Sequence, residues 1–375
     1  MTNWITNDII SFLISLACAG ILIPQILVIA YRKNLFDSID GRKIHTQIVP
    51  RLGGLSFFPS IFFSIVLIAG ISIQFGLQTT LSAYSATAVQ ICFLGCAVMI
   101  MYAVGMVDDL VGVRYIAKFV VQIIAAILLV SSGSYITDLH DFLWLPLLPD
   151  WIGYALTIFC IVFIVNAINL IDGIDGLASG LCIVAFIFYS IVFYSGQEYV
   201  FSMIASASAG TLIPFFYYNV FGKAARHKKI FMGDTGALTI GMILAFCTIN
   251  IINMEQVEII GSDNTFVVAV TPLIIPCFDV VRVYLHRVIR HRNPFLPDKC
   301  HIHHKLLALG LSQRAALCII MLWSALFIIV NILLSPFINP TILIAADVIL
   351  WTSVNIILTQ SISCKERRIG EKIYD

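Results

Sequence analysis

The chain has 375 residues, of which 60% are hydrophobic and 11% are charged, and its mean hydropathy is +0.98. Soluble domains carry about 25% charged residues, so this composition excludes a soluble globular protein and makes lipid the main solvent. The formal net charge of +1 gives no reason to expect a nucleic-acid partner, and we predict none.

The apolar residues occur in long continuous runs, which predict membrane-spanning helices. A helix needs about 20 apolar residues to cross the hydrocarbon core, and open sheet edges are too costly there because their backbone groups lack partners. The runs also lack the alternating segments of about ten residues that are typical of an outer-membrane barrel. We therefore predict eleven spans, at residues 9–31, 53–73, 86–106, 117–133, 151–170, 177–195, 200–219, 236–254, 265–288, 315–334 and 341–360.

The basic residues are segregated between these spans. If the chain starts outside and crosses the membrane once per span, all 22 Lys and Arg fall on one side, and the opposite loops carry acids such as Asp138 and Glu198. The positive-inside rule makes the basic side cytoplasmic. The prediction is an all-α integral membrane protein with one domain, residues 1–375: a polytopic bundle of about eleven transmembrane helices, N-terminus outside and C-terminus cytoplasmic. Asp347, inside the last span, is assigned a structural hydrogen bond, with a functional role as the alternative.

The first cytoplasmic segments carry side chains suited to phosphates and cations. GRKIHTQIVPRLGG contributes His45 and Arg51 as candidate phosphate contacts. GMVDDL places Asp108 and Asp109 side by side at the end of the third span, where two carboxylates repel each other unless a metal or a basic group lies nearby. Lys118 is expected to project toward them from the fourth span. A solvated pair of loop acids is the alternative interpretation.

The motif NAINLIDGIDGLASG contains Asn166, Asn169, Asp172 and Asp175 next to an apolar run. A spacing of three would stack the last three on one face if the segment is helical. The two glycines after the aspartates interrupt that helix and permit a close backbone approach to a ligand. Because these side chains are costly at a membrane, we expect a functional site, and their oxygen ligands suit Mg²⁺ better than zinc.

The motif FMGDTG places Asp234 at the start of the eighth span, just after Lys228 and Lys229. Helix N-termini and glycine-rich turns favour anions, so the carboxylate either caps the helix or anchors a phosphate through a metal. Capping alone is the simpler alternative.

A long polar segment, RHRNPFLPDKCHIHHK, separates the ninth and tenth spans. Its polar side chains are Arg290, His291, Arg292, Asp298, Lys299, Cys300, His301, His303 and His304. A zinc site is an alternative, but the usual paired-cysteine spacing is absent and the neighbouring cations oppose a metal dication. Arg and His donors fit a diphosphate better.

With these motifs together, the chain resembles the polyprenyl-phosphate N-acetylhexosamine-1-phosphate transferases. The resemblance covers roughly residues 32–315 and rests on the aspartate pair, NxxNxxDGxDGL, FMGDTG and HIHH, which occur in the family's order. It implies catalytic cytoplasmic loops near residues 32–52, 107–118, 166–178, 219–236 and 289–314. The HIHH form, in place of three consecutive histidines, is similar to the N-acetylhexosamine branch and differs from the muramoyl-pentapeptide branch.

The resemblance implies roles for individual residues. Asp108 and Asp109 match the family's catalytic pair, and the first of them is favoured as the group that deprotonates or orients the lipid phosphate. Asn169 and Asp234 match the positions that hold Mg²⁺, with Mn²⁺ as a possible substitute. Asp172 and Asp175 match a pair that is either catalytic or positions the nucleotide. The predicted substrate-binding residues are Lys118, Asn166, Asn219, His45, Arg290, Arg292, His301, His303 and His304.

The resemblance further implies a Mg²⁺-dependent enzyme of the bacterial inner membrane with a cytoplasmic active site. Its expected partners are undecaprenyl phosphate, a UDP-N-acetylhexosamine and membrane lipids, and a homodimer is left open. The lipid phosphate would attack the β-phosphorus and release UMP, with an aspartyl-phosphate intermediate as the competing scheme. A muramoyl-pentapeptide donor is the runner-up. A metal-coupled transporter is the alternative of another class, although its polar groups should lie near mid-membrane.

Overall fold

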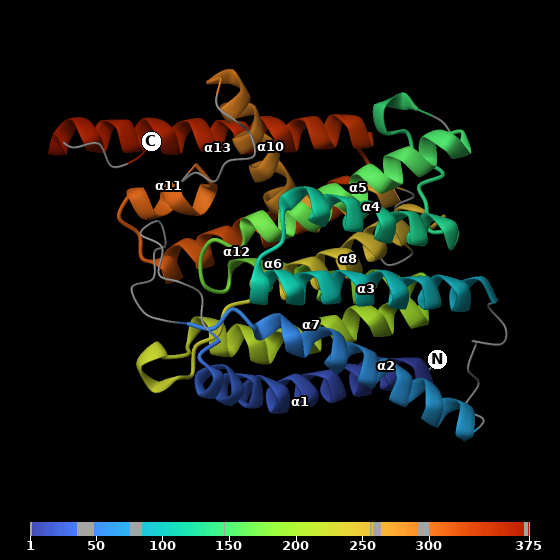
Figure 1. The fold of residues 1–375 in the computed structure, drawn as a ribbon. Coiled ribbons are helices and arrows are strands. Elements are labelled where there is room, and N and C mark those ends of the chain that lie inside the picture. The colour runs from blue at the N-terminus through green and yellow to red at the C-terminus, as the bar shows by residue number, and fades with distance from the viewer. Residues whose placement is uncertain are drawn as a thin grey trace.

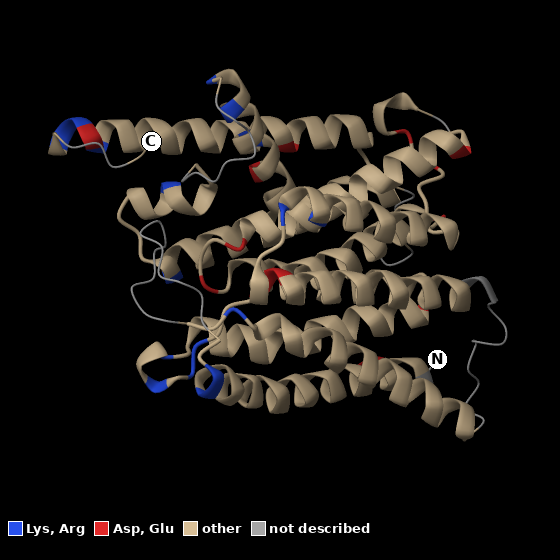
Figure 2. Ribbon diagram, viewed as in Figure 1, with Lys and Arg blue, Asp and Glu red and all other residues tan. Residues whose placement is uncertain are grey.

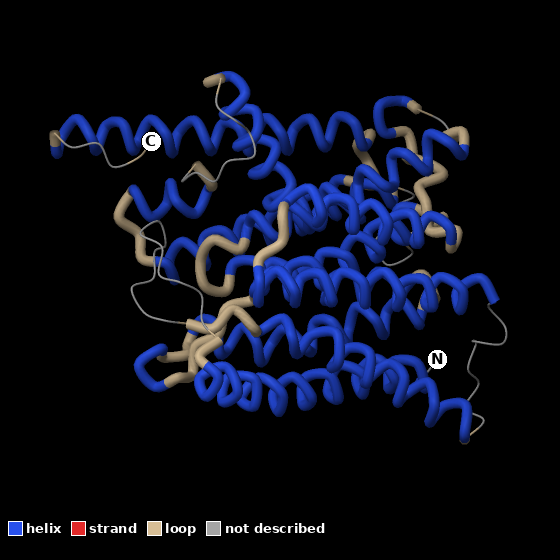
Figure 3. The backbone as a smooth tube through the Cα atoms, viewed as in Figure 1, coloured by secondary structure: helices blue, strands red, loops and turns tan. Residues whose placement is uncertain are grey.

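The computed structural model describes residues 2–35, 49–75, 85–145, 147–255, 257, 264–291, 300–370 and 374. Within those ranges the secondary structure consists of helices joined by loops and turns, with no strand element (Figure 3). The all-α prediction is confirmed.

Eleven helical segments match the predicted spans. They are α1 (Thr2–Lys33), α2 (Phe57–Gln74), α3 (Ser85–Val111), α4 (Tyr115–Ser131), α5 (Asp150–Ile171), α6 (Leu177–Ser195), α7 (Tyr199–Val220), α8 (Gly233–Ile252), the joined α9 (Thr265–Val270), η4 (Thr271–Leu273) and α10 (Ile274–Ile289), then α12 (Gln313–Leu334) and α13 (Pro340–Ile369). In the described chain, ten are long and apolar enough to cross a membrane, whereas α4 has 17 residues. At 1.5 Å per residue α4 is about 25 Å long, so it is the shortest of the eleven segments.

Short helical turns connect these segments. They are η1 (Gly53–Ser56), η2 (Phe142–Trp144), η3 (Ala224–Arg226) and α11 (Ile302–Ala308). Two lysines connect α11 with the last helix: Lys305 Nζ donates to Asn355 Oδ1 at 3.0 Å, and Lys365 Nζ donates to the Ala308 carbonyl at 2.9 Å. Burial, followed by the charge of Arg282, lowers the pKa of Lys305 to about 8.

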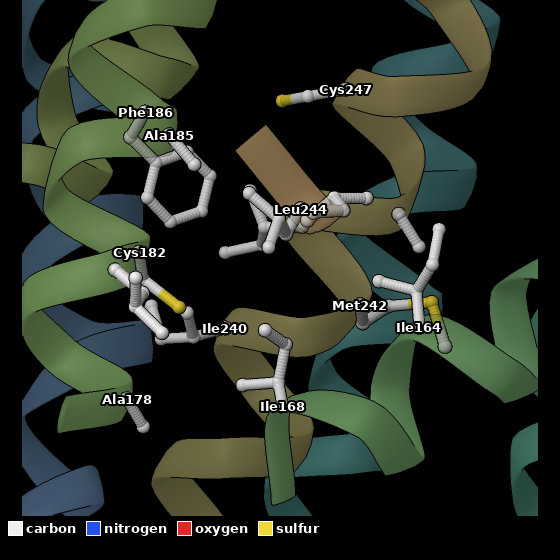
Figure 4. Close-up of a cluster of buried hydrophobic side chains, with 14 of the residues drawn as sticks. Ile164, Ile168, Ala178, Cys182, Ala185, Phe186, Ile240, Met242, Leu244 and Cys247 are labelled. Atoms are coloured by element: carbon white, nitrogen blue, oxygen red, sulfur yellow. The ribbon is translucent and has the colours of Figure 1, made fainter. Parts of the chain in front are cut away.

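Helix α8 lies in the middle of the bundle, where it packs against α3 and α5 (Figure 1). Every residue of α8 is buried except Asp234, in its first turn. Figure 4 shows its apolar side chains, among them Ile240 and Leu244, meeting Ile168 of α5 and Phe186 of α6. A helix that is apolar on all sides belongs in the interior. The partly exposed Asp234 therefore shows which end of α8 is accessible to solvent.

Glycines let the backbone of α8 approach its neighbours closely. A Cβ atom at Gly105 of α3 would lie 2.4 Å from Thr235 Cα, and one at Gly54 of η1 would lie 2.0 Å from the Gly236 nitrogen. Small residues at helix contacts allow this packing in membranes, where dispersion forces replace the hydrophobic effect. These contacts bring the C-terminal end of α3 and the N-terminal end of α8 together.

Two helix ends affect the polar motifs. Helix α3 continues to Val111, beyond the predicted span, so the aspartate pair lies in its last turn. Helix α5 ends at Ile171, within one residue of the predicted span, and Asp172 has ψ of 55°, outside the helical range. The segment from Asn169 to Asp175 is therefore not one helix, and the stacking on one helical face that a helix would give does not occur. Asp and Gly are poor helix formers, which explains why the helix stops there.

The basic residues that fall on one side in the predicted topology also lie apart from the loop acids in the folded structure. Among the described residues, Figure 2 shows Lys and Arg toward one end of the bundle, near the start of α4 and on α10, and shows acidic residues without basic ones at the opposite end. Asp347 lies inside α13 and accepts a hydrogen bond of 2.8 Å from Asn331 Nδ2 of α12. This contact is of the structural kind expected for it.

Candidate functional site

Four polar side chains from separate helices meet where α3 and α5 end and α4 and α8 begin. Lys118 Nζ lies 2.7 Å from Asp108 Oδ2 and 3.5 Å from Asp234 Oδ2, so one ammonium group bridges two carboxylates. Asn169 Nδ2 donates to Asp234 Oδ1 at 2.7 Å. The sequence analysis expected Lys118 to reach the aspartate pair, and it does. Helices α3, α4, α5 and α8 thus each contribute one side chain to a mixed acidic, basic and amide cluster around Asp234.

The two adjacent aspartates have different partners. Asp108 Oδ1 accepts the Val113 N–H at 2.6 Å and its other oxygen faces Lys118. Asp109 instead accepts the backbone N–H groups of Asp234 at 2.8 Å and Thr235 at 2.9 Å, and the Thr235 hydroxyl at 2.6 Å. Those N–H groups belong to the first turn of α8 and have no partner within that helix. Asp109 therefore caps α8 from α3, while Asp108 faces the cluster.

The turn between α5 and α6 carries the second pair of aspartates. Gly176, which precedes α6, has a φ of 81°, a conformation that favours glycine. Asp175 forms an ion pair with Lys229 at 2.5 Å, which joins this turn to the segment before α8. Asp175 is thereby neutralised, whereas no hydrogen bond in the described structure holds the Asp172 carboxylate.

Asp172 reaches solvent on one side but is crowded by protein on the others. The resulting loss of hydration raises its pKa to about 7; the Arg51 charge opposes this rise, and the charges of Asp175, Asp234 and Asp109 add to it. Asp172 therefore titrates closer to neutral pH than an ordinary aspartate, which suits a group that exchanges a proton.

Two asparagines predicted to bind substrate are engaged with the protein. Asn166 Nδ2 donates to Gln122 Oε1 of α4 at 2.6 Å and to the Val162 carbonyl at 2.7 Å. The buried Asn219 of α7 accepts the Gly176 N–H at 2.5 Å and donates to the Ile230 carbonyl at 2.8 Å. Asn219 thus holds together the two segments that carry the Asp175–Lys229 pair.

The histidine segment packs against the turn that follows α5. His301 is the N-cap residue of α11, and its ring is nearly parallel to that of His303, with 5.8 Å between centroids. A Cβ atom at Gly173 would lie 2.2 Å from His303 Nε2, so the imidazole rests directly on that glycine. The ring of His304 contacts that of His303, with 4.2 Å between centroids. The sequence motifs DGIDG and HIHH are therefore neighbours in space.

His303 combines burial with unused hydrogen-bonding groups. Its side chain is 1% exposed, and neither ring nitrogen has a hydrogen-bond partner in the part of the chain that the structure describes. Burial, followed by the charges of His304 and His301, lowers its pKa to about 3, so the ring is neutral at physiological pH. A neutral imidazole offers one donor and one acceptor.

The sequence analysis missed one member of this region, Asp279 of α10. Its side chain is completely buried and receives hydrogen bonds from Arg282, His301 and the Ile302 backbone. The available signal was an aspartate inside an apolar run with an arginine three residues later. That spacing is one helical turn and suits an ion pair at the end of a span.

Three other predicted residues lie apart from the cluster or outside the described ranges. Arg290 is exposed at the C-cap of α10, and no described contact joins it to the aspartates. His45 and Arg292 lie outside the described residues.

The cluster has the composition of a site for a hard cation. Asp108 and Asp234 already converge on a positive group, the Lys118 ammonium, and their donors are oxygen atoms. Asn169 presents its nitrogen to Asp234, and rotation of the amide would present its oxygen instead. Over the described ranges no three His, Cys, Asp or Glu side chains are grouped for metal binding. A cation here would rest on two carboxylates and an amide.

A family model described as glycosyl transferase family 4 matches residues 90–252, a region that includes both aspartate pairs and Asp234. A probable undecaprenyl-phosphate N-acetylglucosaminyl 1-phosphate transferase of Bacillus subtilis (strain 168) is 31% identical over 331 residues, covering 87% of this chain and 84% of the relative.

Two further relatives are similar over most of their length. An undecaprenyl-phosphate alpha-N-acetylglucosaminyl 1-phosphate transferase of Yersinia pestis is 28% identical, over 81% of this chain and 78% of its own. A decaprenyl-phosphate N-acetylglucosaminephosphotransferase of Mycobacterium leprae (strain TN) is 28% identical, over 81% of this chain and 76% of its own.

Proposed function

The chain belongs to glycosyl transferase family 4, and from this we propose that it transfers N-acetylglucosamine-1-phosphate from UDP-N-acetylglucosamine to undecaprenyl phosphate, releasing UMP. The names of its relatives support the polyprenyl phosphate acceptor and the transferred group. The product would start a lipid-linked glycan of the cell envelope. The observation that carries the proposal is the cluster of Asp108, Lys118, Asn169 and Asp234 at one end of an apolar bundle.

The proposed reaction is a direct displacement at phosphorus. An oxygen of the lipid phosphate forms a bond to the sugar-bearing β-phosphorus, and the bond from that phosphorus to the bridging oxygen breaks, so UMP leaves with that oxygen. The second pKa of a phosphate monoester is about 6, so the nucleophile is mostly ionised at neutral pH. Asp108 would orient it and take any remaining proton. Positioning and charge stabilisation then supply most of the catalysis.

Asn169 and Asp234 are proposed to hold Mg²⁺, or Mn²⁺ in its place, with Asp108 near by. The fit rests on their oxygen donors and on the convergence of both carboxylates on the Lys118 ammonium. A bound Mg²⁺ would offset negative charge on the diphosphate. Lys118 offers a second positive charge to the same phosphates, and Asp109 keeps the start of α8 in place.

The competing scheme forms an aspartyl-phosphate first, on Asp108 or Asp172, and passes the sugar phosphate to the lipid afterwards. The two schemes differ in what the enzyme does with the nucleotide sugar alone. A stoichiometric burst of UMP without lipid acceptor supports the covalent route, whereas UMP release only in the presence of acceptor supports direct displacement.

The proposed location is the bacterial inner membrane with the site on the cytoplasmic face. The chain is a multi-pass membrane protein whose relatives are bacterial. The basic residues at the end of the bundle that bears the cluster support the cytoplasmic orientation through the positive-inside rule. Nucleotide sugars are cytoplasmic, so donor supply agrees with this orientation.

The test is UMP release by the purified protein in lipid nanodiscs. UDP-GlcNAc with undecaprenyl phosphate and Mg²⁺ should release UMP, and removal of the acceptor or full chelation of the metal should stop it. Asp234→Asn should abolish turnover, while Asp347→Asn, which changes a membrane carboxylate in another part of the bundle, should not. Turnover of UDP-MurNAc-pentapeptide in preference to UDP-GlcNAc would overturn the proposed donor. Full activity under chelation would overturn the proposed requirement for a metal ion.

A further inference from the structure

Asp279 is a buried carboxylate for which the proposed chemistry has no use. It lies on α10, its side chain is 0% exposed, and Arg282 Nη2 donates to its Oδ1 at 2.8 Å. The other oxygen faces His301 Nδ1 at 2.9 Å, and the Ile302 N–H approaches the carboxylate at 3.2 Å. Burying a charge is costly unless it is paired and hydrogen-bonded. Asp279 meets both conditions, with donors from two segments of chain.

These contacts fix where α11 begins. The Ile302 N–H belongs to the first turn of α11, and such groups need an acceptor from outside the helix. Asp279 supplies it from α10. Arg282 adds a second connection, because its Nη2 also donates to the Cys300 carbonyl at 2.6 Å. Helix α11 has only seven residues and is too short to be stable alone, so its position depends on these anchors.

The same contacts orient the histidine rings toward the proposed site. A hydrogen bond between Asp279 and His301 Nδ1 makes that nitrogen the donor and leaves Nε2 free to face elsewhere. The His301 ring lies nearly parallel to the His303 ring. His303 in turn rests on Gly173, between Asp172 and Asp175. A continuous series of contacts therefore leads from Asp279 to the turn after α5.

We propose that Asp279 is a positioning residue for the nucleotide-sugar donor: by holding His301 and the first turn of α11, it keeps the His303 ring against Gly173 where the donor diphosphate binds. The inference rests on the proposed function, because it assigns Asp279 to the donor side of that reaction. Asp279 touches neither substrate. Its effect reaches the donor only through the two histidines.

The first test is a double-mutant cycle with Asp279→Asn and His301→Gln. Each single variant should raise the KM for UDP-GlcNAc about tenfold and leave the KM for undecaprenyl phosphate unchanged, since only the donor contacts move. Because both changes break the same connection, the donor KM of the double variant should be no higher than that of the more impaired single variant. A role limited to stability would lower the fraction of folded enzyme without changing either KM. Unchanged donor KM in folded Asp279→Asn would overturn the proposal.

A second pair of variants changes His301 and leaves Asp279 intact. This pair tests the positioning role even if Asp279→Asn fails to fold. In His301→Asn the amide occupies the place of Nδ1 and retains a donor for Asp279, whereas in His301→Gln the amide occupies the place of Nε2 and loses it. Both lack the imidazole. His301→Gln should therefore raise the donor KM further than His301→Asn does, by about fivefold. Equal donor KM values in the two variants would overturn the positioning role.

Asp347→Asn is the matched control, because it also neutralises a buried carboxylate that accepts a side-chain hydrogen bond, but between α12 and α13. Its donor KM should equal that of the parent. If the parent itself releases no UMP from UDP-GlcNAc, the proposed function fails. If the parent is active and the Asp279 and His301 variants keep its donor KM, only the positioning role fails.

Discussion

The neighbouring residues Asp108 and Asp109 show how one residue step along a helix separates two functions. Consecutive side chains on an α-helix point about 100° apart. On α3 this directs Asp108 toward Lys118 and Asp109 toward the N-terminus of α8. Identical carboxylates therefore meet different groups: Asp108 meets Lys118 and the Val113 N–H of the turn that follows α3, whereas Asp109 meets the first turn of α8.

The matched variants Asp108→Asn and Asp109→Asn should separate these roles. Asp109→Asn replaces a capping oxygen with an amino group, so we expect a loss of about 1–2 kcal/mol in the free energy of unfolding. Asp108→Asn should keep the parent's unfolding temperature and lower UMP release at least about 100-fold, because it weakens a charged contact in the cluster. Thermal unfolding in detergent and the UMP assay measure the two effects. Loss of stability in the Asp108 variant alone would contradict the assignment.

Asp172 should make the stability of the metal-free protein depend on pH. Its pKa is raised from 3.8 to about 7 by burial, so between these values the folded state binds more protons than the unfolded state. Stability from this group is fully present below the unfolded pKa of 3.8 and is lost progressively until the pH passes the folded pKa of about 7. Asp172→Asn removes the charge, so its gain in unfolding temperature over the parent should be smallest near pH 4 and largest at pH 8. Equal unfolding temperatures at pH 8 would contradict the shifted pKa.

At the scale of elements, contact between α3 and α8 places the cluster. Thr235 lies against Gly105 one turn before the aspartate pair, and this approach allows Asp109 to reach the first turn of α8. The geometry of the site therefore depends on a residue that has no side chain to contribute.

Gly105→Ala should damage both stability and activity. The new Cβ atom would lie 2.4 Å from Thr235 Cα, so the helices must separate, at a cost of about 1–3 kcal/mol. Gly95→Ala on the same helix is the control: its Cβ atom would meet nothing within 4 Å, and alanine favours helix. Unfolding temperature and UMP release measure both variants. Similar behaviour of the two would show that close packing at Gly105 does not set the site.

At the scale of the whole molecule, charge asymmetry and helix count together predict the orientation. The described Lys and Arg leave one end of the bundle without basic groups. Because positively charged loops stay in the cytoplasm, the end bearing Asp108 and Asp234 should face the cytosol.

Fusion proteins in bacterial cells test that orientation. A green fluorescent protein joined to the C-terminus should fluoresce, and alkaline phosphatase at the same position should be inactive, because each reporter folds on one side only. The pattern should reverse when the reporters follow Pro149, in the loop before α5. Active phosphatase at the C-terminus would contradict the predicted topology.

The sequence by itself determined the spans, the segregation of basic residues and the set of polar motifs. Hydropathy and charge act over a single helix length, so the eleven spans were found without knowledge of their neighbours, apart from boundaries such as the end of α3 at Val111. The short helix α11 was not predicted. It also placed Lys118 beside the aspartate pair, because the segments around them are adjacent in the chain.

Only the tertiary structure decided what each polar group meets. The contact of Asp109 with Thr235 joins residues 126 positions apart, and that of Lys118 with Asp234 joins residues 116 positions apart. Such pairs depend on how far each helix slides and rotates against the next, which no local pattern specifies. For the same reason Asp279 passed unnoticed until folding brought His301 to it across 22 residues.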